Sequence, residues 1–381
     1  MNDVATLARN HVDLLPAGGL EEKLKLGRPL RVKLGIDVTS PDIHIGRAIP
    51  LQRMRAFQDE GHTGVLIVGD YTTRIGDPSG RSAERPILSD EEIDKNAKTY
   101  VDQALRILDP ERTEVRFNGE WLSRLTFADV VRLTRTLTVA QLLERDDFAK
   151  RVAAGHPVSV SELLYPLMQA YDSVAIEADV ELGGTDQLYN LLAGRTVMES
   201  YGLEPQVVLT TPLLVSWDGA KMSSSVGNNI PLTAPAEEQF GRTMRIPDTQ
   251  LEQWWRLVVD ESVPAGEPMD AKLALARWIV TRSHGAAAAE AAEAHFTRVV
   301  REGGAPQEVA EHVLPGGETL HVPALLADAF GLSTSDARRL IAQGGVKLEG
   351  ETVTQLDLPR ERLSGGLLQA GKRRFVRFRD A

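Results

Sequence analysis

Residues 31–50 read RVKLGIDVTSPDIHIGRAIP, and this stretch sets the fold class that we expect. Its first part, RVKLGID, alternates apolar and polar side chains, and a period of two residues is typical of a β-strand. From residue 45 to residue 60 the apolar side chains recur at helical spacing. A strand that turns into a helix exposes unpaired backbone N–H groups and the positive end of the helix dipole, which suits phosphate.

Strands and helices are predicted to alternate along the first part of the chain. Continuous apolar runs, typical of buried parallel strands, occupy residues 64–70, 179–182 and 206–215. Helical patterns lie between them, at residues 90–108, 127–146 and 161–176. This alternation predicts an α/β domain, whose parallel sheet is covered by helices on both faces. Ligands of such sheets bind at the C-terminal ends of the strands.

The remaining segments differ in pattern and composition. We expect an N-terminal helical segment (1–30), the sheet domain (31–220), a mobile loop (221–232), a helical domain (233–302), a Gly- and Pro-rich linker (303–323) and a small α/β unit (324–381). In the last unit, a capped helix should end at Gly344 and a hairpin should follow it.

Composition excludes several classes of site. The chain has 381 residues and no cysteine, so disulfides, thiolate metal sites and a cysteine nucleophile are excluded. Its apolar runs are shorter than the roughly 18–20 residues of a membrane span, and the N-terminus does not resemble a signal peptide. We therefore expect a cytoplasmic protein with no membrane partner.

The charge of the chain is unevenly distributed. A net charge of −11 argues against a nucleic-acid partner for the whole chain. Residues 338–381, however, hold ten Lys and Arg against five Asp and Glu, which favours local contact with RNA or DNA. A solvated basic edge strand is the alternative.

Two short runs are candidates for binding phosphate. In HIGR (44–47), His44 can donate a hydrogen bond to a phosphate oxygen, and Gly46 lets a flat group such as adenine approach the backbone. In KMSSS (221–225), Lys221 lies on a hydroxyl-rich loop that can close on a triphosphate and stabilise departing pyrophosphate. The alternatives are a histidine near a helix start and a surface turn.

Three polar residues share one face of the helix predicted over 161–176. Tyr165, Gln169 and Asp172 are spaced i, i+4 and i+7, with Ser161 as the expected N-cap. Because buried polar groups are costly without partners, this strip could bind a small polar ligand. A narrow wet face of an amphipathic helix is the alternative.

Two acidic loops should reach the same edge of the sheet. GDPSGR (76–81) and GGTDQ (183–187) each follow a predicted strand. Of Asp77 and Asp186, one could hold an ammonium group and the other a pair of ribose hydroxyls.

Taken together, these runs resemble the bacterial tyrosyl-tRNA synthetases, which are class I aminoacyl-tRNA synthetases. KLGIDVTSPDIHIG, GDPSGRSAERP, LLYPLMQAYDSVAIEADVELGGTDQ and DGAKMSSS follow the order and spacing of the family. The last 55 or so residues resemble an RNA-binding module found in a small-subunit ribosomal protein. The resemblance implies a Rossmann-like catalytic domain with a dimer-interface insertion, a helical anticodon-binding domain and a homodimer.

The resemblance also implies an activity. L-tyrosine and ATP, with Mg²⁺, form tyrosyl-adenylate, and the tyrosyl group then passes to tRNA(Tyr). Tyr165, Gln169 and Asp77 would hold the substrate ammonium and Asp172 the phenol, while Asp37 and Gln187 line the amino acid and adenylate. Contacts to ATP would come from Thr39, His44, Gly46, Gly184, Asp186, Lys221 and Met222. Catalysis would use His44, Gly46, Arg47, Lys221 and Ser224, without a resident metal ion. RNA would contact Arg338, Arg339, Lys372, Arg373 and Arg374.

The chain departs from the family pattern at a few positions. Arg47 replaces a second histidine, and Ser224 replaces a lysine that the family often has. We hypothesise that Arg47 partly supplies the positive charge missing at Ser224. Pro50 interrupts the helix pattern and favours a kink. Some relatives bind the phenol hydroxyl with a tyrosine at the position near Lys33 or Leu34. This chain has no tyrosine there, so Asp172 should carry more of the specificity.

Two rival functions remain open from the sequence. A small-molecule nucleotidylyltransferase also uses a HxGH-like turn, but it requires neither the Tyr165–Gln169–Asp172 strip nor an RNA-binding tail. A synthetase paralogue kept as an RNA-binding or regulatory protein could carry Arg47 and Ser224 as signs of lost activity.

Overall fold

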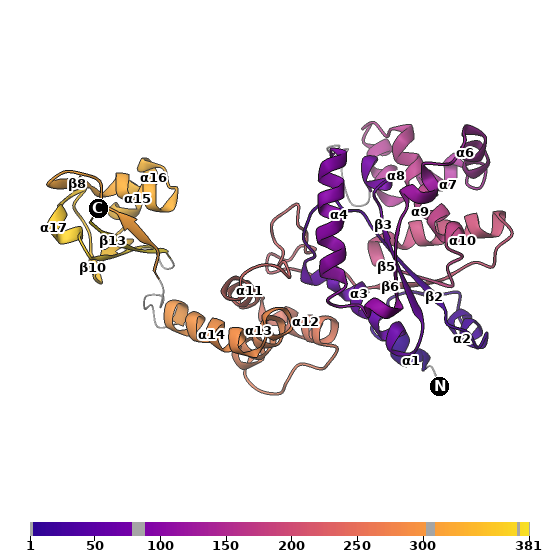
Figure 1. The fold of residues 1–381 in the computed structure, drawn as a ribbon, viewed down its shortest axis with the longest axis horizontal. Coiled ribbons are helices and arrows are strands. Elements are labelled where there is room, and N and C mark those ends of the chain that lie inside the picture. The colour runs from indigo at the N-terminus through magenta and orange to yellow at the C-terminus, as the bar shows by residue number, and fades with distance from the viewer. Residues whose placement is uncertain (1–2, 78–87, 302–308, 372–373, 381) are drawn as a thin grey trace. The chain divides into compact units, whose positions relative to one another are not determined.

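The computed structural model describes residues 3–77, 88–301, 309–371 and 374–380 (Figure 1). It divides into two compact units, one of residues 1–234 and 245–275 and the other of residues 235–244 and 276–381. The helical domain expected over 233–302 is thus shared between the units, and the domain boundaries other than that of the linker stay predictions. No helix in these described ranges is both long and apolar enough to cross a membrane.

A six-stranded sheet organises the first unit, in the order β1-β6-β5-β2-β3-β4. The strands are β1 Leu14–Leu15, β2 Arg31–Ile36, β3 Thr63–Val68, β4 Thr113–Phe117, β5 Val180–Gly184 and β6 Val207–Thr211. All neighbours pair in parallel except β1, which runs antiparallel to β6. The predicted strands are confirmed, whereas β4 was not predicted, and β1 lies within the N-terminal segment that was expected to be helical.

The strand order contains a switch point between β2 and β5. From β2 the chain proceeds through β3 to β4 on one side, and β5 and β6 are added on the other side. The register aligns Leu34 of β2 with Leu182 of β5 and with Leu66 of β3. Because the strands are parallel, their C-terminal ends open a crevice at this point, where ligands bind in α/β sheets.

Helices cover both faces of this sheet. On one face, Leu66 and Val68 of β3 join a core that contains Met54, Phe57 and Tyr100. These three residues come from α3 (Ile45–Asp59) and α4 (Asp90–Ala104). On the opposite face Val65 and Ile67 pack with residues 176–178, just after α9 (Val160–Ala175). Residues 64–68 of β3 are all buried and successive side chains enter opposite cores, which confirms a strand buried on both sides.

The shorter helices of this unit were only partly predicted. They are α1 Val4–Leu7, α2 Gly19–Leu24, α5 Gly119–Leu122, α6 Phe127–Thr134, α7 Val139–Leu143, α8 Asp146–Ala153 and α10 Leu188–Ser200. The single helical stretch expected over 127–146 is wrong, because the chain breaks after α6 and restarts at Thr138. Thr138 begins α7 with a reciprocal capping box to Gln141.

The predicted N-cap of α9 is also wrong. The cap is Ser159, whose Oγ accepts from the backbone N–H of Glu162, while the Glu162 carboxylate accepts from the N–H of Ser159. Glu162 is three residues after Ser159, which is the spacing that a capping box requires. Ser161 therefore lies inside the first turn. Pro50 is accommodated within α3, which continues to Asp59.

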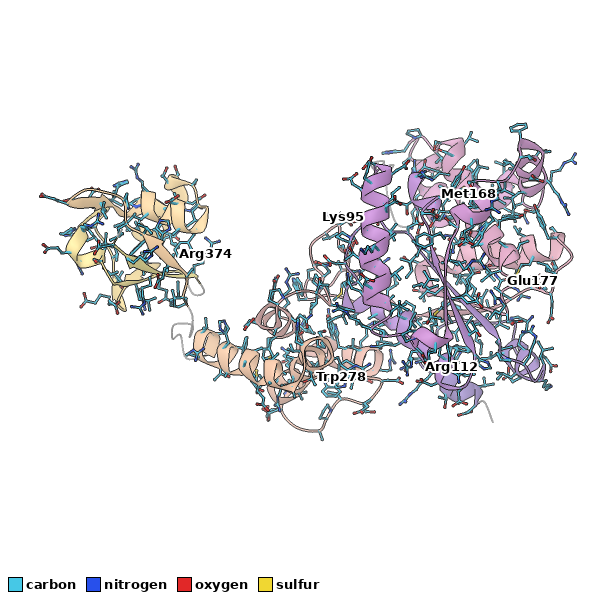
Figure 2. The ribbon with its side chains drawn as sticks, in the orientation of Figure 1. Lys95, Arg112, Met168, Glu177, Trp278 and Arg374 are labelled. Carbon is cyan, nitrogen blue, oxygen red and sulfur yellow. The ribbon has the colours of Figure 1, made fainter. Side chains whose placement is uncertain are left out.

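The helices that follow fall within the helical domain predicted over 233–302. They are α11 Ala236–Thr243, α12 Leu251–Trp254 with a π-helical turn over Trp255–Val259, α13 Pro268–His284, and α14 Ala286–Phe296 with a second π-helical turn over Thr297–Arg301. Four short 3₁₀ helices occur elsewhere in the described chain, at Thr72–Arg74, Pro110–Arg112, Thr185–Gln187 and Asp248–Gln250. Figure 2 shows the side chains along these elements, among them Trp278 of α13.

The C-terminal module combines two small sheets with three helices. Its strands are β7 Glu311–Val313, β8 Thr319–His321, β9 Val346–Leu348, β10 Glu351–Thr352, β11 Asp357–Pro359, β12 Leu367–Ala370 and β13 Arg374–Arg379. Its helices are α15 Val322–Phe330, α16 Thr334–Ala342 and α17 Arg360–Leu363. Gly344 follows α16 with a positive φ of 68°, and β9 and β10 form the predicted hairpin.

The predicted linker is wrong for its second half. β7 pairs with β13, and β8 pairs with β11, so both strands belong to the C-terminal module. Residues 311–321 are rich in glycine and proline only at the turn between these two strands. In this half of the segment, the Gly- and Pro-rich signal for a linker came from this turn.

Candidate active site

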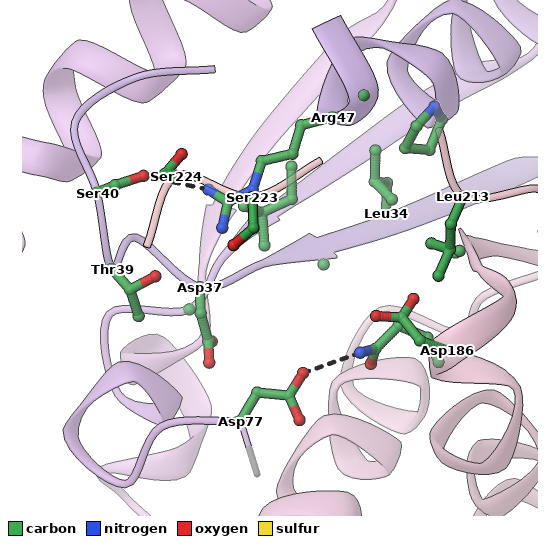
Figure 3. Close-up of a pocket in the computed structure, with 18 of the residues that line it drawn as sticks. Leu34, Asp37, Thr39, Ser40, Arg47, Asp77, Asp186, Leu213, Ser223 and Ser224 are labelled. Carbon is green, nitrogen blue, oxygen red and sulfur yellow. Dashed lines mark hydrogen bonds between the residues drawn. The ribbon is translucent and has the colours of Figure 1, made fainter. Parts of the chain in front are cut away.

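A cavity of about 1230 Å³ opens at the C-terminal ends of β2, β3, β5 and β6. Its lining includes every residue of the first unit that the sequence suggested for a site: Asp37, Thr39, His44, Gly46, Arg47, Asp77, Tyr165, Gln169, Asp172, Gly184, Asp186, Gln187, Lys221, Met222 and Ser224. Figure 3 shows Asp37, Asp77, Asp186 and Arg47 around this space. The fold thus brings together the two short runs, Asp77 and Asp186 of the two acidic loops, and the polar strip of α9, although their roles stay predictions. Residues 78–81 of the first acidic loop lie outside the described residues.

His44 is the N-cap of α3 and has a defined tautomer. Its Nδ1 accepts a hydrogen bond from the backbone N–H of Arg47, at 3.3 Å. The ring proton therefore lies on Nε2, which can donate to an anion in the cavity. Burial, together with the charges of Arg47 and Lys221, lowers the pKa of His44 to about 3. The ring is neutral at physiological pH and acts as a donor without carrying charge.

Backbone hydrogen bonds join the start of α3, where HIGR lies, to the segment that follows KMSSS. The N–H of Ile45 donates to the carbonyl of Ile230 at 3.0 Å, and the N–H of Leu232 donates to the carbonyl of Ile43 at 2.8 Å. His44 and Pro231 form the antiparallel bridge between these bonds. The segment that follows KMSSS is therefore fixed directly beside the start of α3.

The KMSSS loop is organised around one buried amide. Asn228, 4% exposed, donates to the Asp218 carboxylate at 2.8 and 3.0 Å and to the carbonyl of Lys221 at 3.1 Å. Its own Oδ1 accepts from the N–H of Ser223 at 2.8 Å, and its carbonyl accepts from the Ser216 hydroxyl. Asn228 thus connects both sides of the loop, a role that the sequence analysis missed.

Two cations of the site have local partners. Lys221 Nζ lies 2.5 Å from Asp186 Oδ2, which joins the loop to the end of β5. Arg47 Nη1 donates weakly to Ser40 Oγ, at 3.4 Å (Figure 3). Both cations line the cavity, as do Ser223 and Ser224. An anion in the cavity could therefore draw on two positive charges and several hydroxyls.

Asp172 lies at the closed end of the cavity. It is 3% exposed, and its carboxylate accepts from Trp121 Nε1 at 2.8 Å and from Asn118 Nδ2 at 3.3 Å. Burial raises the pKa of Asp172 to about 7, while the Lys33 charge opposes that rise. An ionised carboxylate offers about four lone-pair sites, so two donors leave room for a ligand hydroxyl.

Asn118 and Trp121 are site residues that the sequence analysis missed. They follow β4 directly, at the same sheet edge as the other loops. Recognising a strand over residues 113–117 would have placed the run NGEW there. Asn118 also donates to Thr72 Oγ1 at 3.0 Å, and Thr72 in turn donates to Asp37 at 2.7 Å. These bonds connect the two acidic residues of the closed end.

A second polar cluster surrounds Asp77. Its carboxylate accepts from Gln187 Nε2 at 2.8 Å and from Arg145 Nη2 at 3.2 Å. Asn190 donates to Gln187 Oε1 at 2.9 Å and to Gln169 Oε1 at 3.0 Å. Tyr165, on the same face of α9 as Gln169, donates its hydroxyl to Asp37 at 3.0 Å. Arg145 and Asn190 were missed because nothing in the local sequence distinguishes them from surface residues.

The predicted RNA-binding residues belong to the second unit. Arg338 and Arg339 are exposed on α16, and Arg374 is exposed at the start of β13 (Figure 2). Arg339 pairs with Asp336 at 2.6 Å, and Arg338 approaches His321 Nε2 at 3.4 Å. Lys372 and Arg373 lie outside the described residues.

Comparison with known proteins places this site in a family. A model of the tRNA synthetases class I (W and Y) matches residues 25–301. The chain is 48% identical to the tyrosine–tRNA ligase of Thermotoga maritima, over 98% of this chain and 96% of that protein. It is 46% identical to the tyrosine–tRNA ligase of Moorella thermoacetica, over 98% and 94% of the two chains.

The fold agrees with that assignment. The structure of a tyrosyl-tRNA synthetase complexed with L-tyrosine, from Archaeoglobus fulgidus, aligns with a TM-score of 0.63 at 24% identity. It covers 75% of this chain and 97% of the other. At this identity the likeness concerns the fold, and the family follows from the sequence matches. The chain is therefore a member of the class I tRNA synthetases of the tryptophan and tyrosine group.

Proposed function

We propose that this protein is a tyrosine–tRNA ligase that first activates L-tyrosine with ATP. A tyrosine carboxylate oxygen attacks the α-phosphorus of ATP, the bond to the bridging oxygen breaks, and pyrophosphate leaves. A terminal ribose hydroxyl of tRNA(Tyr) then attacks the tyrosyl carbonyl carbon, and AMP leaves. The observation that carries the proposal is a single cavity lined both by the buried carboxylate of Asp172 and by His44, Arg47 and Lys221.

The closed end suits a phenol and an ammonium group. Asp172 would accept the phenolic proton through lone pairs that Trp121 and Asn118 leave available. Tyr165, Gln169 and Asp77 would hold the ammonium, with Asp37 and Gln187 lining the adenylate. A phenylalanine substrate would leave the Asp172 acceptor unpaired, which is how sites that bind a hydroxyl reject its deoxy analogue.

The phosphate side would act by positioning and by stabilising charge. His44 Nε2–H donates to a phosphate oxygen, and Lys221 and Arg47 stabilise the charge on departing pyrophosphate. Asp186 and Gly184 would bind the ribose, and Thr39, Gly46 and Met222 would line the ATP. No side chain needs to act as a covalent nucleophile, because the tyrosine carboxylate itself attacks.

ATP is used by this family as a substrate, and we propose that Mg²⁺ enters with it. Among the described residues, no group of three or more His, Cys, Asp and Glu side chains is arranged to hold a metal ion. Mg²⁺ keeps several waters and binds phosphate oxygens readily, so the nucleotide would supply most of its ligands.

A homodimer belongs to the same proposal. The insertion between β4 and β5 carries large apolar side chains in water, including Phe127 at 84% exposure and Val139 at 62%. They come from α6 and α7, which lie one after the other in the chain. A second copy that covers them would remove this apolar area from water. We also propose a cytoplasmic location, where tRNA, ATP and tyrosine occur together.

One pair of assays separates this function from its rivals. Tyrosine-dependent exchange of labelled pyrophosphate into ATP tests activation, and charging of tRNA(Tyr) tests transfer. We expect both from this protein. A nucleotidylyltransferase would show no dependence on tyrosine, and an RNA-binding paralogue would bind tRNA without catalysing the exchange.

A further inference from the structure

A fully buried ion pair lies beneath the closed end of the cavity. Lys33 and Glu181 are 0% and 1% exposed, and Lys33 Nζ is 2.8 Å from Glu181 Oε1. They occupy neighbouring strands, β2 and β5, and are directly paired in the sheet register. Neither lines the cavity, so the pair does not touch a ligand there.

The pair is bonded to the part of α9 that carries Asp172. Lys33 Nζ donates to the carbonyl of Gln169 at 2.9 Å and to the hydroxyl of Ser173 at 2.7 Å. Ser173 donates to Glu181 Oε2 at 3.0 Å, and Gln206 donates to the same oxygen at 2.8 Å. Gln169 and Ser173 enclose Asp172 in the helix, so the network fixes its backbone on both sides.

Stability alone does not account for such a pair. Removing two charges from water is costly, and replacing a buried pair with apolar side chains is often neutral or stabilising. This pair lies at a point where the charges have another effect, because the fields of Lys33 and Glu181 act on Asp172 with opposite signs.

We propose, resting on the function proposed above, that Lys33 and Glu181 are positioning residues for tyrosine selection. They hold the Gln169–Ser173 turn of α9 against the sheet, and their opposing charges set the ionisation of the carboxylate that receives the phenol. They touch neither tyrosine nor ATP and act through Asp172.

The charged groups on the elements around Asp172 include Glu120 of α5, which pairs with Arg116 of β4 at 2.6 Å. Lys33 and Glu181 face it from β2 and β5, and Asp37 is linked to it through Thr72 and Asn118. The charged side chains of the helices that pack against α9 have other surroundings. Arg74 pairs with Asp90, Arg195 donates to the Gln206 carbonyl, and Arg132 lies on the Tyr201 ring. Asp129 accepts from the Thr126 N–H in the capping box of α6, and Glu199 is exposed. Tyr189, on α10, donates to the Gln141 carbonyl.

The direction of each effect follows from the charges. Burial raises the Asp172 pKa to about 7, Lys33 lowers that pKa and Glu181 raises it. Lys33→Met therefore raises the pKa of Asp172 further, so that the carboxylate ionises only at higher pH. Glu181→Gln keeps the size and most hydrogen bonds of the side chain and lowers the pKa of Asp172.

The test is the pH dependence of kcat/KM for tyrosine in pyrophosphate exchange, measured on the full chain. This quantity reports groups that titrate in the free enzyme. The parent should lose activity below about pH 7, as Asp172 becomes protonated. Lys33→Met should move the acid limb to higher pH and Glu181→Gln to lower pH, with a change in kcat/KM of about tenfold on the limb if the pKa moves by about one unit.

A matched control is available on the same helix. Arg151 and Glu162 form another buried ion pair, 2.5 Å apart, at the start of α9. Arg151→Met removes a buried cation but should leave the acid limb in place, even if it lowers stability. Should Lys33→Met fail to fold, Glu181→Gln alone still tests the sign.

A second readout separates this inference from the proposed activity. The titration of the Asp172 carboxyl, followed by NMR of ¹³C-labelled protein without substrate, should shift in the same two directions. Shifts in a common direction, or none, would overturn the inference. If the Asp172 titration shifts in opposite directions in the two variants but the protein shows no tyrosine-dependent exchange, the effect of the ion pair on Asp172 stands and the proposed function is wrong.

Discussion

Lys221 and Asp186 form an ion pair at the mouth of the active-site cavity, with Nζ and Oδ2 2.5 Å apart. In the proposed function both side chains contact ATP, one at the phosphates and the other at the ribose. ATP must therefore replace this pair with its own contacts. The Lys221 side chain is 52% exposed, so the exchange costs at most about 1 kcal/mol. The pair keeps the loop near the sheet without preventing substrate binding.

Asn228→Ala should disorder the KMSSS loop and weaken its action on ATP. The change removes the bonds to Asp218, Lys221 and Ser223, which together connect the two sides of the loop. We expect a higher KM for ATP and a lower kcat in pyrophosphate exchange, with tyrosine binding nearly unchanged. Asn228→Asp should be at least as damaging, because its carboxylate would face that of Asp218. An equal loss of tyrosine binding in both variants would show that Asn228 supports the whole domain instead.

His44→Asn should retain more activity than His44→Ala. Asparagine can cap α3 through its amide oxygen and can still offer an N–H to phosphate, whereas alanine loses both. Because the pKa of His44 lies near 3, the ring stays neutral as pH rises from 5 to 8. The pH profile of the maximal exchange rate should therefore have the same limbs in the parent and in His44→Asn. A limb near pH 6.5 that vanishes in this variant would mean that His44 works as a cation.

Asp172→Ala should collapse the discrimination between tyrosine and phenylalanine. Sites built around a substrate hydroxyl reject the deoxy analogue by roughly 10⁴–10⁵, since a buried acceptor is otherwise left unpaired. The ratio of kcat/KM for the two amino acids in pyrophosphate exchange measures this effect. If the variant still rejects phenylalanine as strongly as the parent, Asp172 has been misassigned.

Arg47 and Ser224 should show coupled effects, if Arg47 supplies charge that a lysine at 224 would otherwise give. Both line the cavity beside Lys221. Arg47→Ala should slow activation by roughly 10²–10³, the cost of removing one transition-state donor. Ser224→Lys should restore part of that loss while changing the parent less. A double-mutant cycle on the activation rate measures the coupling, and additive effects would dismiss the compensation.

Removal of the C-terminal module should separate the two half-reactions. A cut before residue 309 removes β7 and β8 together with the strands they pair with. A cut at residue 324 would instead leave β7 and β8 in the protein without their partner strands. The first truncation should keep adenylate formation and weaken tRNA charging. The intact protein should lose tRNA affinity steeply with salt, because Arg and Lys contacts to phosphates release counterions. An equal loss of adenylate formation and tRNA charging would mean that the module is needed for the protein to fold.

The sequence alone determined the parallel sheet, the helices that begin and line the site, and the residues gathered around the cavity. These follow from local signals: periods of two or 3.6 residues, and motifs whose side chains lie close together in the chain. The same signals failed where the chemistry of a cap or a turn decided the boundary, as at Ser159, at Thr138 and in the strands β7 and β8.

Only the tertiary structure decided which side chains are partners across the chain. Trp121 meets Asp172, Lys33 meets Glu181, and Lys221 meets Asp186 only after strands and loops from separate segments pack at one sheet edge. A periodic pattern predicts whether a residue is buried and which face of its element it occupies. It does not indicate which residue from another segment will contact that side chain. The ionisation of Asp172 depends on such partners and on burial, and is therefore a property of the packed fold.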